Sequence, residues 1–85
     1  MALLKSATAK ATLAAGNYWK ITRNDFNGMT TKTRVELSLF VNESARMSGA
    51  ALIDYETFEF DGELDRDTCY DMIKSTDAFS DAEDV

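Results

Sequence analysis

Carboxylates are the side chains of this sequence best suited to chemistry, and most of them lie in its last third. Twelve of the fifteen Asp and Glu residues fall between Asp54 and Asp84. Two carboxylates close in sequence, such as Asp61 and Glu63, could act as a general acid and a general base. However, 85 residues that are rich in predicted strand leave little room for a deep cleft. We therefore expect a protein that is not an enzyme.

The same segment does not fit the common metal sites. When Gly62 is aligned with the invariant glycine of an EF-hand loop, Thr57 and Thr68 fall at the first and twelfth ligand positions, where carboxylates are required. The sequence has no histidine and one cysteine, so the usual zinc ligand sets and an internal disulfide are excluded. A serine or cysteine nucleophile would lack its usual histidine base. We expect no metal and no cofactor, and we expect Cys69 in the core.

The carboxylates belong to a marked charge split along the sequence. Seven basic against three acidic residues give residues 1–50 a formal charge of about +4, and two against twelve give residues 51–85 about −10. Such a split bears on partner choice more than on fold. The acidic segment could be a solvated face, a contact surface for a basic subunit or the basic half of a second copy, or an imitation of DNA phosphates. The basic first half argues against the imitation.

Alternation with a period of two predicts an antiparallel sheet that would position these residues. The clearest run extends from Thr31 to Asn42, with Thr, Val and Leu on one face and mostly polar residues on the other. Residues 18–23 alternate in the same way, and residues 6–13 and 50–60 are further strand candidates. The alternation slips within residues 50–60, so we expect a β-bulge near Thr57.

Turn residues separate the predicted strands. Gly16-Asn17 and the segment from Asn24 to Gly28 have the composition of turns, and Asn-Gly tolerates the positive φ angles of tight hairpins. Residues 42–49 are predicted to form a loop. No stretch approaches the roughly 20 apolar residues that span a bilayer. The N-terminal residues also lack the apolar run of a signal peptide, so we expect synthesis in a cytoplasm and no membrane partner.

One helix is predicted after the strands, from an N-cap at Asp65 to about residue 75. Asp67 in the first turn and Lys74 in the last turn suit the helix dipole. Its apolar stripe would consist of Cys69, Met72 and Ile73. The sequence thus predicts a single α+β domain over residues 1–85, with about four strands in the order β-β-β-β-α and the helix packed on the sheet. Residues 76–85 would form an acidic tail that can be extended.

Aromatic residues and the acidic tail supply the candidates for a subunit interface. Phe40 lies on the otherwise polar face of the long strand. It could belong to a second, smaller packed face that the helix or tail covers, or it could be an anchor in a subunit interface. Trp19 is expected in the core or at a subunit contact. The candidate interface residues are Trp19, Phe40, Phe79, Asp81, Glu83 and Asp84. Nucleic acid is not expected as a partner, because the basic half has no recognition motif.

Six segments carry a resemblance to a known group of proteins. They are the Met-Ala-Leu start, Tyr18-x-Lys20-Ile21, residues 35–41 (VELSLFV), residues 58–61 (FEFD), Tyr70-Asp71-x-Ile73-Lys74 and residues 79–85 (FSDAEDV). In this order, the sequence resembles small structural proteins encoded among the tail and tail-fibre genes of tailed bacteriophages. The resemblance implies a non-enzymatic adaptor or accessory subunit, present in several copies in the virion and bound to other virion proteins. It carries over no individual binding residue.

Two other functions are compatible with the sequence. An acidic, phage-encoded inhibitor could occupy a host DNA-binding defence enzyme as a DNA mimic. A regulatory or chaperone-like binding module would stay out of the mature particle.

Overall fold

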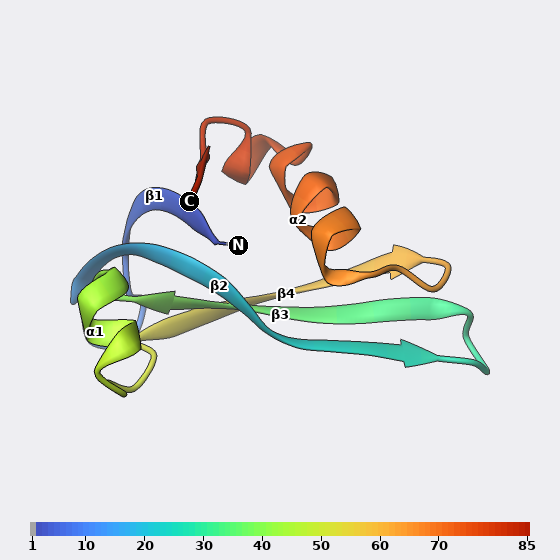
Figure 1. Ribbon diagram of the computed structural model, residues 1–85, viewed down its shortest axis with the longest axis horizontal. Helices are drawn as coiled ribbons and strands as arrows, with labels where there is room; N and C mark the ends of the chain where they lie inside the picture. Colours follow the sequence, from blue (N-terminus) through green and yellow to red (C-terminus); the bar gives the residue numbers. More distant parts are fainter. Residues whose placement is uncertain (1) are drawn as a thin grey trace.

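The computed structural model describes residues 2–85 and has one antiparallel sheet with helices on it (Figure 1). The elements are β1 (Leu3–Thr8), β2 (Ala15–Asn27), β3 (Lys32–Phe40), α1 (Glu43–Met47), β4 (Asp54–Asp61), α2 (Arg66–Lys74), the 3-10 turn η1 (Asp77–Phe79) and β5 (Glu83–Asp84). The strand order is β4-β3-β2-β1-β5. The predicted α+β class is confirmed, with five strands instead of about four.

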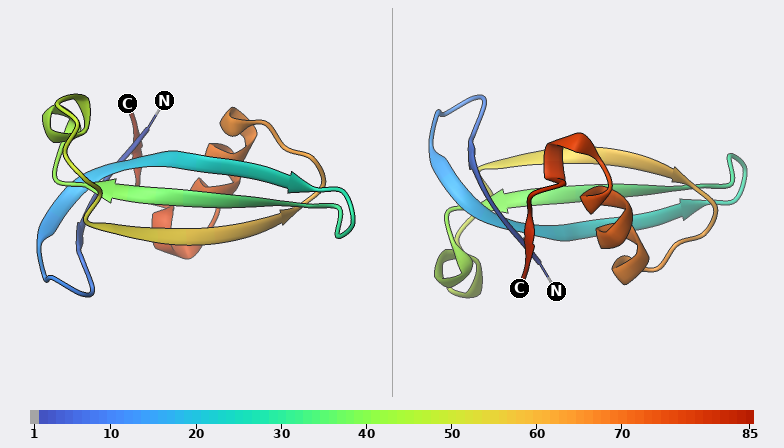
Figure 2. Two further views of the ribbon diagram at one scale, coloured as in Figure 1. Left: turned by 90° about the horizontal axis from the view of Figure 1, so that it is seen from below. Right: turned by 90° about the horizontal axis from the view of Figure 1, so that it is seen from above.

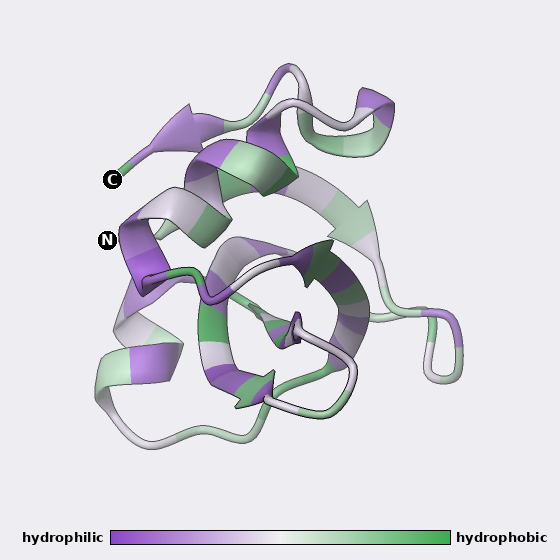
Figure 3. Cartoon of the chain, turned by 90° about the vertical axis from the view of Figure 1, so that its right-hand side faces the viewer, coloured by the Kyte–Doolittle hydropathy of each residue, from purple (hydrophilic) through white to green (hydrophobic). Residues whose placement is uncertain are grey.

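The core lies between one face of the sheet and the C-terminal segment. Figures 1 and 2 show α2 and η1 on the same side of the sheet. The strands contribute Leu3, Trp19, Ile21, Val35, Leu37 and Leu39, and the C-terminal segment contributes Cys69, Tyr70, Ile73, Phe79 and Ala82. The view along the long axis in Figure 3 shows strongly curled strands with alternating hydrophobic and hydrophilic bands. We call the side under α2 the core face and the other side the open face.

Strand β3 has the alternation that the sequence predicts. Thr33, Val35, Leu37 and Leu39 are buried on the core face, as expected for one parity of the strand. Residues of the other parity lie on the open face, which carries the charged side chains of the strand. The position of β3 between β2 and β4 explains why its core-face residues are so completely covered.

The predicted β-bulge near Thr57 is wrong. The register between β3 and β4 runs without a shift from the pair Lys32 and Asp61 to the pair Leu39 and Asp54. The apparent slip arises because Ile53 precedes β4 and does not share its alternation. Bulges lie instead in β1 between Leu4 and Ala7 and in β2 between Ile21 and Arg23.

Two predicted turns are also placed differently. Gly16-Asn17 lies within β2, where Gly16 pairs with Ala7, and the chain reverses between residues 9 and 14 instead. A Cβ at Gly16 would lie 2.6 Å from the carbonyl oxygen of Phe40, so glycine is required there by close packing. Strand β2 continues to Asn27, and the positive φ angle of the following turn falls on Thr31 and not on Gly28.

Residues 42–49 and 76–85 contain more regular structure than the sequence suggests. The predicted loop contains α1, whose N-cap Asn42 accepts a hydrogen bond from the backbone N–H of Ala45. The acidic tail forms η1 and β5, and β5 pairs with β1. Backbone hydrogen bonds of 3.0 Å run in both directions between Ala2 and Val85, so the tail is fixed to the sheet.

Helix α2 confirms the predicted cap but corrects the apolar stripe. The Asp65 carboxylate accepts a hydrogen bond of 2.7 Å from the backbone N–H of Thr68. Cys69 and Ile73 are buried as expected, whereas Met72 is 40% exposed. Tyr70 takes its place in the core because positions 69, 70 and 73 lie on one side of a helix with 3.6 residues per turn.

Candidate protein-binding site

Three aromatic rings from distant parts of the chain meet on the core face. The rings of Trp19 and Phe79 pack edge to face with centroids 5.1 Å apart, and those of Phe58 and Phe79 lie 6.1 Å apart. They line a half-open pocket of about 300 Å³, which we call the aromatic pocket. Its other lining residues are small or charged: Lys5, Ala7, Thr8, Lys10, Asp54, Glu56 and Ala78. An apolar base with a charged rim suits the binding of an apolar group.

Lys10 joins the two walls of the aromatic pocket. Its Nζ atom lies 2.7 Å from Glu56 Oε1, and its backbone N–H donates to Asp54 Oδ2 at 3.1 Å. The hydrogen bond and charge of Glu56 raise the pKa of Lys10. The backbone N–H groups of Lys10 and Tyr55 lower the pKa of Asp54. The turn between β1 and β2 is thus attached to the beginning of β4 across the core face.

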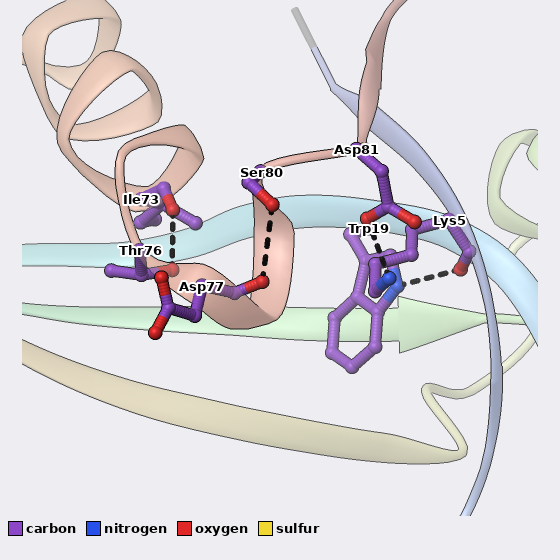
Figure 4. A network of polar contacts seen from close by, with 7 residues as sticks. All are labelled: Lys5, Trp19, Ile73, Thr76, Asp77, Ser80 and Asp81. Atoms are coloured by element: carbon purple, nitrogen blue, oxygen red, sulfur yellow. Dashed lines mark hydrogen bonds and ion pairs between the residues drawn. The ribbon is translucent and has the colours of Figure 1, made fainter.

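A second polar network holds the Trp19 side of the pocket (Figure 4). The indole Nε1–H of Trp19 donates to the carbonyl oxygen of Lys5 at 2.9 Å. Lys5 Nζ lies 2.6 Å from Asp81 Oδ1, and this contact lowers the pKa of Asp81. In the same view, the Ser80 hydroxyl donates to the Asp77 carbonyl at 3.2 Å across η1. These contacts fix the Trp19 indole and the η1 turn, which ends at Phe79.

The structure brings three of the six interface candidates together. Trp19 and Phe79 are in contact and each is only 4% exposed, so a partner can reach them only as part of the aromatic pocket. Asp81 is exposed beside them. Glu83 and Asp84 lie at exposed positions in β5, opposite Leu4 and Leu3 of β1, and do not line the aromatic pocket. The Asp84 carboxylate also forms an ion pair of 2.9 Å with Lys74.

Phe40 lies on the open face, apart from the aromatic pocket. It is 6% exposed and belongs to a small cluster with Ala2 and Tyr18, against which Leu4 packs. The guanidinium carbon of Arg46 in α1 lies 5.5 Å from the ring centroid. A second packed face is therefore present, but it is covered by α1 and the N-terminal strand, not by the C-terminal helix or tail.

Eight of the ten residues that line the aromatic pocket were not candidates in the sequence, among them Phe58, Lys10, Asp54 and Glu56. The Phe58-x-Phe60 repeat indicates a buried strand face, which is the available signal for the third ring. The contacts of Lys10 with Asp54 and Glu56 join positions 44 and 46 residues apart. Local sequence holds no signal for such contacts, because they depend on how the sheet curls.

The charge split of the sequence is only partly neutralised by ion pairs within the molecule. Ion pairs of Lys5 with Asp81, Lys10 with Glu56 and Lys32 with Asp61 connect the basic first half to the acidic remainder. The carboxylates that project from α2 and its flanking loops are exposed: Glu63, Asp65, Asp67, Asp71 and Asp77. The molecule therefore has an acidic outer layer on α2 and a sheet of mixed charge.

Within residues 2–85, the acidic side chains and Cys69 form no group of three or more that could hold a metal ion. Cys69 is buried in the core as predicted, and burial raises the pKa of its thiol. No helix in the described part of the chain is long and apolar enough to cross a membrane.

Comparison of the chain with protein-family models, curated proteins and solved structures finds no match. The fold and the site define a small α+β protein with an apolar pocket between its antiparallel sheet and its C-terminal segment.

Proposed function

We propose that this chain is a non-enzymatic structural protein of a tailed bacteriophage, an adaptor or accessory subunit of the tail or tail-fibre region that acts through protein-protein contacts. The aromatic pocket is the observation that carries the protein-binding part of this proposal. Its volume of about 300 Å³ is at the lower limit of small-molecule sites and has room for a large apolar side chain of a partner. The virion, the presence of several copies and the phage partners are supported by the sequence resemblance.

The polar groups around the aromatic pocket favour a protein partner. Lys10 is paired with Glu56 and Lys5 with Asp81, so the rim charges are already satisfied within the chain. An apolar anchor surrounded by polar groups that exclude water is typical of the energetic centre of a protein interface. The partner would insert an aromatic or aliphatic side chain against Trp19, Phe58 and Phe79.

The DNA-mimic alternative has less support from the structure. A mimic needs carboxylates that face a basic groove without nearby cations. Here Lys10 and Lys32 lie beside the carboxylates of β4, and Lys5 lies beside Asp81. The outer surface of α2 has more carboxylates than cations, but Arg66 is exposed among them.

Filling the aromatic pocket tests the binding site. Ala78 lines the pocket and is exposed, so Ala78→Trp should place an indole in the opening without removing a core side chain. We expect capture of phage partner proteins from an infected-cell lysate to fall about tenfold or more, as for loss of one anchor. The matched control is Ala51→Trp, at an exposed position outside the aromatic pocket. Equal capture by both variants would contradict the proposed site.

Mass spectrometry of purified phage particles tests the structural role separately. We expect the chain in stoichiometric amounts together with tail proteins. Its absence from the particles would overturn the virion proposal. Capture of a host nuclease that is released by salt would instead support the acidic inhibitor.

A further inference from the structure

We propose that the outer edge of β4 accepts an extended strand of another protein in which basic and apolar residues alternate. This inference rests on the proposed protein-binding function and names the chemistry of a partner at a second surface. Strand β4 is the last strand of the sheet and pairs only with β3 in the described chain. Its other side presents backbone N–H and C=O groups, which can pair with a strand from another chain.

The accessible part of this edge is the second half of β4. Lys10 contacts Asp54 and Glu56 at the beginning of the strand, whereas residues 57–61 have no comparable contact from the turn between β1 and β2. A hollow of about 210 Å³ lies against this second half, lined by Arg34, Thr57, Phe58 and Glu59. Residues 57–61 are therefore the stretch on which a short strand can add.

Charges on the open face alternate in sign from strand to strand. Asp25 of β2 lies opposite Arg34 of β3, and Arg34 lies opposite Glu59 of β4. In the neighbouring row, Lys32 of β3 lies opposite Asp61 of β4 at an ion-pair distance of 3.8 Å. Opposite charges on directly paired strands stabilise a sheet, and like charges destabilise it. A strand added beyond β4 continues both rows if it places Lys or Arg beside Glu59 and Asp61.

On the core face of the same edge, the added strand should have apolar residues. Phe58 and Phe60 are partly buried, and their rings stack with centroids 5.9 Å apart. Side chains of an added strand alternate between the two faces. Residues between the basic positions therefore lie beside the two rings and cover their exposed parts. Strand β3 already pairs with β4 in this way, because its Lys-Thr-Arg-Val segment lies opposite residues 58–61.

A second copy of the chain is disfavoured at this edge. Antiparallel pairing of two copies along residues 57–61 would place Glu59 and Asp61 of both copies together on the open face of the joined sheet. Like charges on adjacent strands destabilise pairing, and edge charges of this kind protect natural sheets from self-association. The edge thus selects a basic strand from a different protein.

A binding experiment with defined peptides tests this inference. The probe is a capped Lys-Val-Lys-Val-Lys-Val peptide, compared with Lys-Lys-Lys-Val-Val-Val of the same composition and with Glu-Val-Glu-Val-Glu-Val. We expect the alternating basic peptide alone to shift the amide NMR signals of residues 57–61 and to slow their hydrogen exchange, with a Kd in the millimolar range or tighter. The peptide would pair along the outer edge of β4 and contact Phe58 from that side, without entering the opening of the aromatic pocket beside Ala78, so Ala78→Trp should bind this peptide normally.

Matched charge reversals separate the edge from general acidity. Glu59→Lys should weaken binding of the alternating basic peptide about tenfold, because it puts like charges opposite each other. Asp71→Lys makes the same charge change on the exposed side of α2 and should leave the affinity within about twofold. Both positions are exposed, so both variants should fold. Because Glu59→Lys also places a like charge opposite Arg34 of β3, circular dichroism and thermal unfolding will check both variants.

Four results would overturn the inference. They are no NMR response to millimolar alternating basic peptide, shifts confined to α2 or the C-terminal residues, equal binding of the block or acidic peptides, and equal weakening by Glu59→Lys and Asp71→Lys. Dimerisation of the free chain with protected β4 amides, measured by sedimentation and hydrogen exchange, would assign the edge to a second copy instead.

Discussion

The hydroxyl group of Tyr70 connects α2 to the sheet at a single backbone group. It accepts a hydrogen bond of 2.7 Å from the N–H of Ile21, and both residues are buried. Ile21 borders the β2 bulge, where the extra residue Thr22 locally disrupts the pairing with β3. The phenol therefore satisfies a donor in an irregular part of the sheet. Burial raises the pKa of Tyr70, so the neutral hydroxyl is the form that packs there.

We expect Tyr70→Phe to destabilise the protein although it preserves the ring. The substitution leaves the N–H of Ile21 buried without its acceptor, which costs about 1–3 kcal/mol. Urea unfolding should show a lower midpoint with an unchanged slope. Tyr55→Phe is the control, because Tyr55 is 54% exposed, and we expect a change within about 0.5 kcal/mol. Equal stability of both variants would show that this hydrogen bond has no net effect.

The role of a single residue could be predicted from the sequence where that role depends on residues close to it in the chain. The cap by Asp65 and the burial of Cys69 follow from helix start signals and helical spacing. The aromatic pocket could not be predicted, because Trp19, Phe58 and Phe79 are far apart in sequence and meet only after the sheet curls. The same holds for the two contacts of Lys10 with the beginning of β4.

At the scale of elements, Gly16 determines how closely β2 approaches its surroundings. A Cβ at this position would meet the Phe40 carbonyl oxygen at 2.6 Å and Ile53 Cδ1 at 2.8 Å. The connection before β4 is thus packed directly on the backbone of β2. A glycine in a strand often marks such a close approach. A glycine followed by asparagine also suggests a turn, which is why sequence alone misplaces the residue.

Gly16→Ala and Gly28→Ala should have different effects on stability. We expect Gly16→Ala to destabilise the protein by about 1–3 kcal/mol, as for overpacking, because a backbone atom must move. A Cβ at Gly28 meets nothing within 4 Å and the φ angle is not positive, so Gly28→Ala should be neutral or stabilise by up to about 1 kcal/mol. Thermal unfolding followed by circular dichroism would measure both. Similar melting temperatures for the two variants would contradict the close-packing argument.

Strong local signals predicted the central elements, and tertiary contacts determined the others. The alternation of β3 extends over nine residues, and α2 has a cap at its beginning, so both were predicted within one or two residues. β5 has two residues and exists because β1 lies beside it, and α1 has five residues. The bulges in β1 and β2 follow from how the sheet bends around its core. No local pattern of residues in the sequence predicts that bend.

At the scale of the whole molecule, ionisable groups set limits on stability at both ends of the pH range. Hydrogen bonds lower the pKa of three carboxyl groups. Lys10 donates to Asp54, Thr68 donates to Asp65, and Lys5 donates to Asp81. A carboxyl group whose pKa is lower in the folded than in the unfolded state stabilises the folded protein at pH values above its unfolded pKa of about 3.9. This stabilisation is lost as the pH falls. Burial raises the pKa of Cys69 and Tyr70. Their stabilising effect is present below the unfolded values of about 8.5 and 10 and is lost as the pH rises.

We therefore expect a stability plateau between about pH 5 and 8, with losses on both sides. Urea midpoints measured from pH 3 to pH 10 would test it. Cys69→Ala should reduce the decline between about pH 8 and 10, and Asp81→Asn should reduce the decline below about pH 4, each relative to its own value at pH 7. An alkaline decline that is unchanged in Cys69→Ala would assign it to other groups.

The pairing of β1 with β5 has a consequence for how the chain folds. Leu3 and Asp84 are direct partners, so the sheet joins positions 81 residues apart in sequence. Contacts of such long range slow folding, because the entropy of closing a long loop is lost before the contact is made. During synthesis, the hairpin of β2 and β3 can form early, whereas β1 cannot gain its second neighbour until Asp84 has left the ribosome. The first strand to be made is thus among the last to be completed.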